Sequence, residues 1–164
     1  MYSLLNKFNF NKLLILFCVI VAQIYVPSIR FNQVIIIPDF ILIFCTYLVL
    51  SNRLLEAIVF SFLLSFVQDM TFNLDMAGIF SFSKLVCIYL MGFINDYEKI
   101  WTRQSKLTFI CMAYLINYLI FYSFLLMFNP YWTLFIQSIL FQTLLSFLIF
   151  YLIDIFIYNI INRS

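Results

Sequence analysis

The stretch from Ala57 to Asp69 reads A-I-V-F-S-F-L-L-S-F-V-Q-D and decides how the rest of the chain is interpreted. Its small residues Ala57, Ser61 and Ser65 are spaced four apart, and Asp69 follows at the same interval. Residues four apart lie on one face of an α-helix, so the stretch predicts a stripe of small residues that ends in a carboxylate. Such stripes let helices pack closely in lipid, and a carboxylate in an apolar helix is a candidate functional group.

The composition of the chain predicts a membrane protein. Of its 164 residues, 66% are hydrophobic and only 10% are charged, whereas soluble domains carry about 25% charged residues. The mean hydropathy is +1.09. A soluble fold would expose too much apolar surface to water, so we expect one all-α domain over residues 1–164, embedded in a bilayer. The net charge of +2 gives no support for a nucleic-acid partner.

The residue types that hold metals and redox groups are scarce. The chain has no histidine, and its four cysteines lie in separate apolar runs without a C-x-x-C pair. We expect no cofactor and no metal, and we interpret the cysteines as small apolar residues.

Six apolar runs predict six transmembrane helices, over residues 13–29, 34–50, 54–68, 78–94, 107–128 and 133–157. The first run follows two lysines but lacks a signal-peptide cleavage motif, so we interpret it as a retained helix. In the second run, Pro38 and Asp39 favour a helix that starts there, after an extended stretch. The second and third runs fall short of the roughly 20 residues that span a bilayer, which indicates backbone that faces protein or a water-filled cavity.

The distribution of Lys and Arg predicts the orientation. If the N-terminus is cytoplasmic, the inner segments carry seven basic residues and the outer loops carry only Arg30; the seven are Lys7, Lys12, Arg53, Lys99, Arg103, Lys106 and Arg163. This positive-inside pattern predicts two cytoplasmic termini and a multi-pass membrane protein.

This topology puts three ionisable residues in the outer half of the bilayer. Asp39 lies near the start of the second helix, and Asp69 ends the third. Lys84 lies six residues into the fourth helix, roughly 9 Å below its outer end. We expect Lys84 to pair with Asp39, with Asp69 or with both, because intramembrane charges usually have partners. The alternative is that Lys84 extends towards the headgroups and the acids meet water.

The same placement argues against an enzyme. Asp69 and Asp154 fall at opposite faces of the membrane, and Lys84 would keep Asp39 and Asp69 ionised rather than sharing a proton. No serine has a histidine base, and two glycines cannot build a phosphate-binding loop. We therefore expect no catalytic residues.

The segment from Ile37 to Gly92 carries four features that occur together. They are I-P-D-F-I-L-I at 37–43, a turn at Arg53 between two short helices, the small-x-x-x-small-x-x-x-Asp series Ser61, Ser65 and Asp69, and Gly78 after eight intervening residues. In these features, and in length and helix number, the chain resembles the MreD family of rod shape-determining membrane proteins. It departs from the family in having Ala57, Ser61 and Ser65 where glycines are frequent.

The resemblance implies a fold similar to the S-components of energy-coupling-factor transporters and a non-enzymatic role. MreD-like proteins bind MreC, and through it act with MreB, RodA and a transpeptidase penicillin-binding protein in the elongasome. From the bacterial inner membrane, they help to direct lateral peptidoglycan synthesis and so regulate cell shape. The alternative is a substrate-binding S-component of a vitamin transporter. Such subunits usually carry an A-x-x-x-A-type motif on the first helix, where this chain has only Ala22.

A concrete mechanism follows from the resemblance and the charges. A groove between the second, third and fourth helices, near Asp39, Asp69 and Lys84, would receive the membrane helix of an MreC-like protein. The packing face would consist of four small residues, Ala57, Ser61, Ser65 and Gly78. The alternative is that the small-residue stripe packs inside the chain. The polar segment 95–106 either meets partners or anionic headgroups, or is an ordinary solvated loop.

Overall fold

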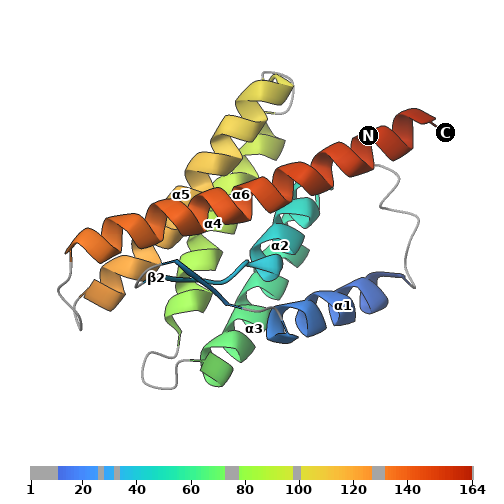
Figure 1. The fold of residues 1–164 in the computed structure, drawn as a ribbon. Helices are drawn as coiled ribbons and strands as arrows, with labels where there is room; N and C mark the ends of the chain where they lie inside the picture. The colour runs from blue at the N-terminus through green and yellow to red at the C-terminus, as the bar shows by residue number, and fades with distance from the viewer. Residues whose placement is uncertain are drawn as a thin grey trace.

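The computed structural model describes residues 11–25, 28–31, 34–72, 78–97, 101–126 and 132–163. These residues form six helices and one short β-hairpin (Figure 1). The elements are α1 (Asn11–Tyr25), β1 (Ile29–Phe31), β2 (Val34–Ile36), α2 (Phe40–Leu50), α3 (Leu54–Phe72), α4 (Ile79–Asp96), α5 (Arg103–Leu126) and α6 (Trp132–Arg163). The prediction of an all-helical architecture with six helices is confirmed, with the hairpin as an addition. Of the basic residues behind the topology prediction, Lys7 and Lys99 lie outside the described residues, as do the side chains of Lys12, Arg30 and Arg163.

The short helix α2 lies at the centre of the fold. It contacts α1, α3, α4 and α6, while α3, α4, α5 and α6 pack in chain order. Figure 1 shows the long helix α6 crossing this bundle obliquely. Seven of the eleven residues of α2 are buried: Ile41, Leu42, Ile43, Cys45, Thr46, Val49 and Leu50. A helix that is apolar on every side belongs in a core, and eleven residues reach only about 16 Å.

The predicted boundaries of the first two helices were wrong. Helix α1 ends at Tyr25 instead of residue 29, and α2 begins at Phe40 instead of residue 34. The residues between them form an antiparallel hairpin in which Ile29 pairs with Ile36. Pro38 and Asp39 explain the late start of α2, because proline favours an extended residue before it and aspartate caps a helix. The extended stretch expected before Pro38 is therefore present.

Three other helices are longer than predicted. Helix α3 continues past Asp69 to Phe72, so this aspartate lies within the helix. Helix α5 begins at Arg103 instead of residue 107, because Thr102 caps it: the Thr102 hydroxyl accepts a hydrogen bond from the Ser105 N–H at 3.2 Å. Helix α6 extends to Arg163, six residues beyond its predicted end. The polar segment assigned to a loop thus supplies the first turn of α5.

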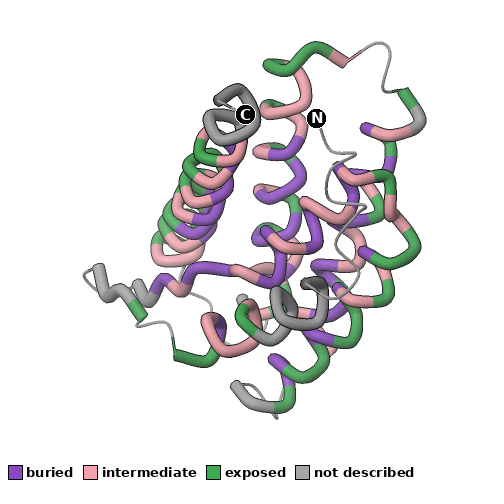
Figure 2. Tube along the Cα trace, turned by 90° about the vertical axis from the view of Figure 1, so that its right-hand side faces the viewer, coloured by how far each residue is buried: buried purple, intermediate pink, exposed green. Residues whose placement is uncertain are grey.

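The outward faces of the helices are apolar. In Figure 2 buried and exposed residues alternate along the helices. On α3 the exposed large side chains are Leu55, Val59, Phe62, Leu63, Phe66, Val67 and Met70. Among the described residues, two helical segments are long and apolar enough to cross a membrane, Arg103–Leu125 and Trp132–Ile157. Only 33% of the most apolar stretch of each segment is buried. An apolar surface this extensive needs a non-aqueous environment, so the fold indicates a membrane protein.

Candidate functional site

The segment that leads into α2, Ile37 to Asp39, is bound by side chains from three other helices. Gln23 of α1 is buried; its Nε2 donates to the Pro38 carbonyl at 3.2 Å, and its Oε1 accepts from the Phe40 N–H at 2.8 Å. One side chain thus fixes the backbone on both sides of Asp39. An extended segment inside an apolar fold needs such partners, because its backbone groups have no helical ones.

Gln142 of α6 binds the preceding residue in the same way. Its Oε1 accepts from the Ile37 N–H at 3.2 Å, and its Nε2 donates to the Ile37 carbonyl. The amide therefore exchanges two hydrogen bonds with one peptide residue, as a neighbouring β-strand would. Gln23 and Gln142 together tie the start of the central helix to α1 and α6.

Asp39 both caps α2 and forms an ion pair. Its Oδ1 accepts from the Leu42 N–H at 3.0 Å, which caps α2, and its Oδ2 lies 2.9 Å from Lys84 Nζ of α4. Both side chains are buried, with 4% and 0% of their surface exposed. The ammonium of Lys84 also donates to Gln68 Oε1 of α3 at 2.5 Å and lies 5.3 Å from the centre of the Phe80 ring. Of the two carboxylates predicted as partners of Lys84, Asp39 is the one that binds.

Asp69 has a different role from the one predicted. Its two carboxylate oxygens accept hydrogen bonds from the start of α4: Oδ1 from the Phe80 N–H at 3.1 Å, and Oδ2 from the Ser81 N–H at 3.1 Å and the Ser81 hydroxyl at 2.8 Å. These are the N–H groups that the side chain of a helix-capping residue normally satisfies. The capping position is Gly78, which has no side chain and a φ of 101°. Asp69 therefore caps α4 from the neighbouring helix, where the helix dipole also favours a negative charge.

The small-residue stripe lies inside the chain. Ala57, Ser61 and Ser65 are all completely buried on α3, whose neighbours are α2 and α4. The inward direction, one of the two left open by the sequence, is the one observed. Gly78, which we expected on the packing face, contributes no packing there, because nothing lies within 4 Å of where its Cβ would be. The glycine at a close helix contact is Gly92, whose Cβ would lie 2.9 Å from Leu54 Cδ2.

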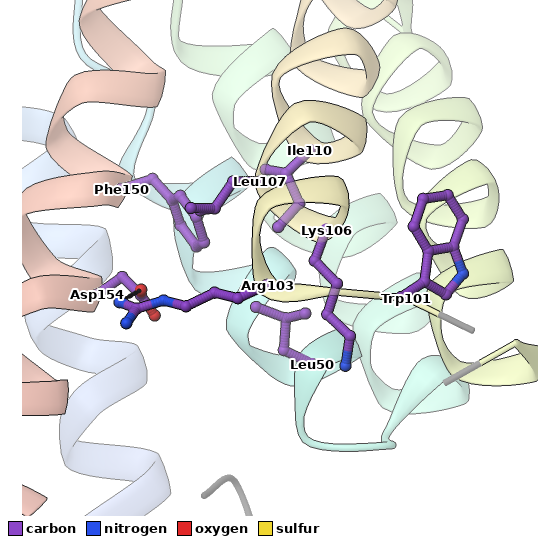
Figure 3. Close-up of a pocket in the computed structure, with 8 residues that line it drawn as sticks. All are labelled: Leu50, Trp101, Arg103, Lys106, Leu107, Ile110, Phe150 and Asp154. Atoms are coloured by element: carbon purple, nitrogen blue, oxygen red, sulfur yellow. Dashed lines mark hydrogen bonds and ion pairs between the residues drawn. The ribbon is translucent and has the colours of Figure 1, made fainter. Parts of the chain in front are cut away.

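A second group of charged residues lies at the opposite end of α2. Arg103, at the start of α5, donates from Nη2 to Asp154 Oδ2 of α6 at 3.1 Å. Nearby, Asn95 of α4 donates from Nδ2 to the Val49 carbonyl at 2.9 Å, which satisfies the C-terminal end of α2. Figure 3 shows that Arg103 and Asp154 border a pocket between these helices.

These contacts define what the buried polar groups do. Asp39 and Asp69 each accept N–H groups at a helix start, and each lies in its own network. Among the described residues, no group of three His, Cys, Asp or Glu side chains is placed to hold a metal ion. The arrangement thus fixes α2, α3 and α4 relative to one another.

Protein-family models, curated proteins and solved structures give no match to this chain. A role for the chain therefore rests on its geometry and on the residues that carry the resemblance.

Three glutamines contribute to this network: Gln23, Gln68 and Gln142. Interhelical hydrogen bonds were expected from the sequence for Gln23 and Gln142, and both form, whereas Gln68 was given no role. Each is a buried amide in an otherwise apolar helix, with 4%, 8% and 7% of its surface exposed. Isolated glutamines in apolar helices predict a hydrogen bond to another helix. Such a glutamine does not reveal from the sequence that its partner is a backbone group, as is the case for Gln23 and Gln142. Asp154 was assigned no role from the sequence, with Arg163, Arg53 or water as its possible partners, and the structure pairs it with Arg103.

Proposed function

We propose that this chain is an MreD-like, non-enzymatic adaptor of the bacterial elongation complex. It sits in the inner membrane with six spans and two cytoplasmic termini, and binds an MreC-like protein. Through that protein it acts with MreB, RodA and a transpeptidase penicillin-binding protein to help direct lateral peptidoglycan synthesis and cell shape.

One observation carries the proposal: Pro38, Asp39, Asp69 and Gly78, which carry much of the resemblance, all lie where α2, α3 and α4 are joined. Pro38 and Asp39 form the entry to α2, Asp69 and Gly78 form the start of α4, and Lys84 ties α4 to α2. Residues far apart in sequence thus share one task, which is to fix three helices. A fold whose buried charges are engaged in this way is suited to act as a scaffold.

The geometry changes the mechanism expected from the sequence. Asp39, Asp69, Lys84 and the small-residue stripe are interior, so they are not available to a partner helix. In the revised proposal these residues hold the scaffold, and the partner helix meets outward apolar side chains. Val59, Phe62 and Phe66 of α3 are examples, because α3 packs on α2 and α4 with its opposite face exposed.

Co-purification tests the proposal. The tagged chain is expressed with the MreC-like protein of the same cell and captured in mild detergent, and the wild type is expected to retain that protein. A variant with Phe62→Ala and Phe66→Ala should lose it, whereas Leu144→Ala with Leu152→Ala, which truncates the same number of exposed apolar side chains on α6, should retain it.

The same assay tests whether Asp39 and Lys84 act inside the fold rather than on the partner. A variant with Asp39→Asn and Lys84→Met, which removes both charges together, should still capture the partner. Loss of capture from a folded double variant would mean that the charges contact the partner directly. Failure of the wild type to capture any MreC-like protein, together with saturable binding of a vitamin-like ligand, would contradict the adaptor role and favour a transporter S-component. The neighbouring genes give a further check: an MreC-like reading frame supports the adaptor, and a pair of ATPase genes contradicts it.

A further inference from the structure

A pocket of about 220 Å³ lies at the end of α2 that is remote from Asp39. It is formed where the C-terminal residue of α2, the first two turns of α5 and the second half of α6 meet (Figure 3). Because α2 is eleven residues long, this pocket is about 16 Å from the Asp39–Lys84 pair. It is therefore a separate site from the network described above.

The pocket has an apolar wall and a basic rim. Leu107, Ile110 and Phe150 line it from the bundle side, and the last two are almost fully buried. Arg103 and Lys106, one helical turn apart on α5, supply two positive charges. Among the lining residues Asp154 is the one carboxylate, and Arg103 binds it.

Charge and position both favour an anion. Two basic side chains and one acid line the pocket, and the side chain of Arg103 remains half exposed despite its ion pair. Both basic residues lie in the first turn of α5, where the helix dipole adds partial positive charge. Asp154 is 95% buried and holds the guanidinium in place from α6. Arginine in such a fixed position is well suited to bind a phosphate.

The position along the helices identifies the kind of anion. The apolar part of α5 starts directly after Lys106, and the candidate membrane segment of α6 ends three residues after Asp154. The pocket therefore lies at the same end of both segments, at the level of lipid headgroups if they cross the bilayer. Trp101, which also lines it, is a residue type enriched at that level. Basic pockets between membrane helices bind anionic headgroups.

We propose that this pocket binds the phosphate of an anionic phospholipid. Arg103 and Lys106 donate hydrogen bonds to the phosphate oxygens, and the apolar wall of the pocket receives the upper part of an acyl chain. This wall is the reason for choosing a lipid over a soluble phosphate, which would leave it uncovered. The proposal is independent of any MreC-like partner and rests only on the membrane location.

Tryptophan fluorescence gives a direct assay, because the chain has only two tryptophans, Trp101 and Trp132. Trp132 is 68% exposed, so Trp132→Phe leaves Trp101 as a single reporter at the pocket. The protein is titrated in zwitterionic detergent micelles with phosphatidylglycerol, phosphatidylcholine, glycerol phosphate or inorganic phosphate. We expect a saturable change of Trp101 emission with phosphatidylglycerol alone. An equal response to phosphatidylcholine, or an equal response to either soluble phosphate, would overturn the proposal.

A matched pair of variants tests the site itself. In the reporter background, Lys106→Gln and Arg53→Gln each remove one positive charge at the predicted cytoplasmic side, and only Lys106 lines the pocket. Lys106→Gln should weaken phosphatidylglycerol binding about fivefold, the effect of one basic group near a membrane surface, and Lys106→Arg should restore it. Arg53→Gln should leave the binding curve unchanged. Equal weakening by the Lys106→Gln and Arg53→Gln variants would show general surface attraction and refute a specific pocket.

Discussion

Replacement of Lys84 by methionine tests whether the Asp39–Lys84 pair holds the interior together. Methionine is close to lysine in length and apolar, so Lys84→Met removes the charge while largely filling the same volume. The variant leaves Asp39 buried, with the Leu42 N–H still bound to Oδ1 but without the ammonium 2.9 Å from Oδ2. Gln68 Oε1 also loses this donor.

The size of the effect follows from the burial of both groups. At 2.9 Å, Coulomb's law with an effective dielectric constant of about 20 gives about 6 kcal/mol of attraction. Desolvation of the two ions costs several kcal/mol each, so the intact pair adds little net stability. Removal of Lys84 alone keeps the cost of burying Asp39 and loses the attraction. We therefore expect the free energy of unfolding to fall by about 3–4 kcal/mol, and to recover to within about 2 kcal/mol of wild type when Asp39→Asn is added.

The assay is reversible unfolding by SDS in mixed micelles, followed by far-UV circular dichroism. Asparagine keeps the acceptor that caps α2, so the double variant isolates the charge. Glu56→Gln is the control: Glu56 pairs with Arg53 at 3.4 Å with its side chain 46% exposed, and the expected loss is below about 1 kcal/mol. If Lys84→Met costs no more than this control, or if the double variant is as unstable as the single one, the Asp39–Lys84 pair does not hold the interior together.

Three further changes are expected to lower the free energy of unfolding in the same assay. Asp69→Ala should cost about 2–3 kcal/mol, because it leaves buried N–H groups at the start of α4 unpaired. Asp69→Asn should recover part of that loss, and an equal loss in both variants would contradict capping by Asp69. Gln142→Leu should cost about 2 kcal/mol by stripping both partners from Ile37, whereas Gln137→Leu, at an exposed site on the same helix, should have almost no effect. Gly78→Ala should cost about 1–2 kcal/mol through its φ of 101° alone, since nothing lies near the added methyl group, and an unchanged stability would refute backbone strain.

The sequence predicted the features that depend on residue type alone. The rarity of charge in an apolar chain made an ion pair of Lys84 the natural expectation, and it forms with Asp39. Six apolar runs predicted six helices, and Pro38 with Asp39 predicted where the regular part of α2 begins. These follow from local propensity and from the cost of an isolated intramembrane charge.

Hydrogen bonds from side chains to backbone groups far away in the sequence could not be predicted. Asp69 was expected to meet a charge, yet it binds N–H groups of α4, because Gly78 lacks a capping side chain and α3 continues past Asp69. Likewise, the pattern of α6 shows that Gln142 is an isolated amide and does not show that its partner is the peptide of Ile37, 105 residues away. Such pairings depend on how helices pack, which periodicity along one helix does not report.

The charged residues near the two ends of α2 have different kinds of partner. At the Asp39 end, each carboxylate is buried and binds helix N–H groups, as apolar surroundings require of a helix that starts in the interior. At the Leu50 end, the basic groups border a pocket, and Arg103 is half exposed although Asp154 beneath it is buried. Burying a charge is costly unless it is paired and hydrogen-bonded, whereas a half-exposed cation beside a cavity can also bind an anion from outside. The buried charges are thus explained by the architecture of the chain, and recognition of a ligand is better sought where the first turn of α5 meets α6.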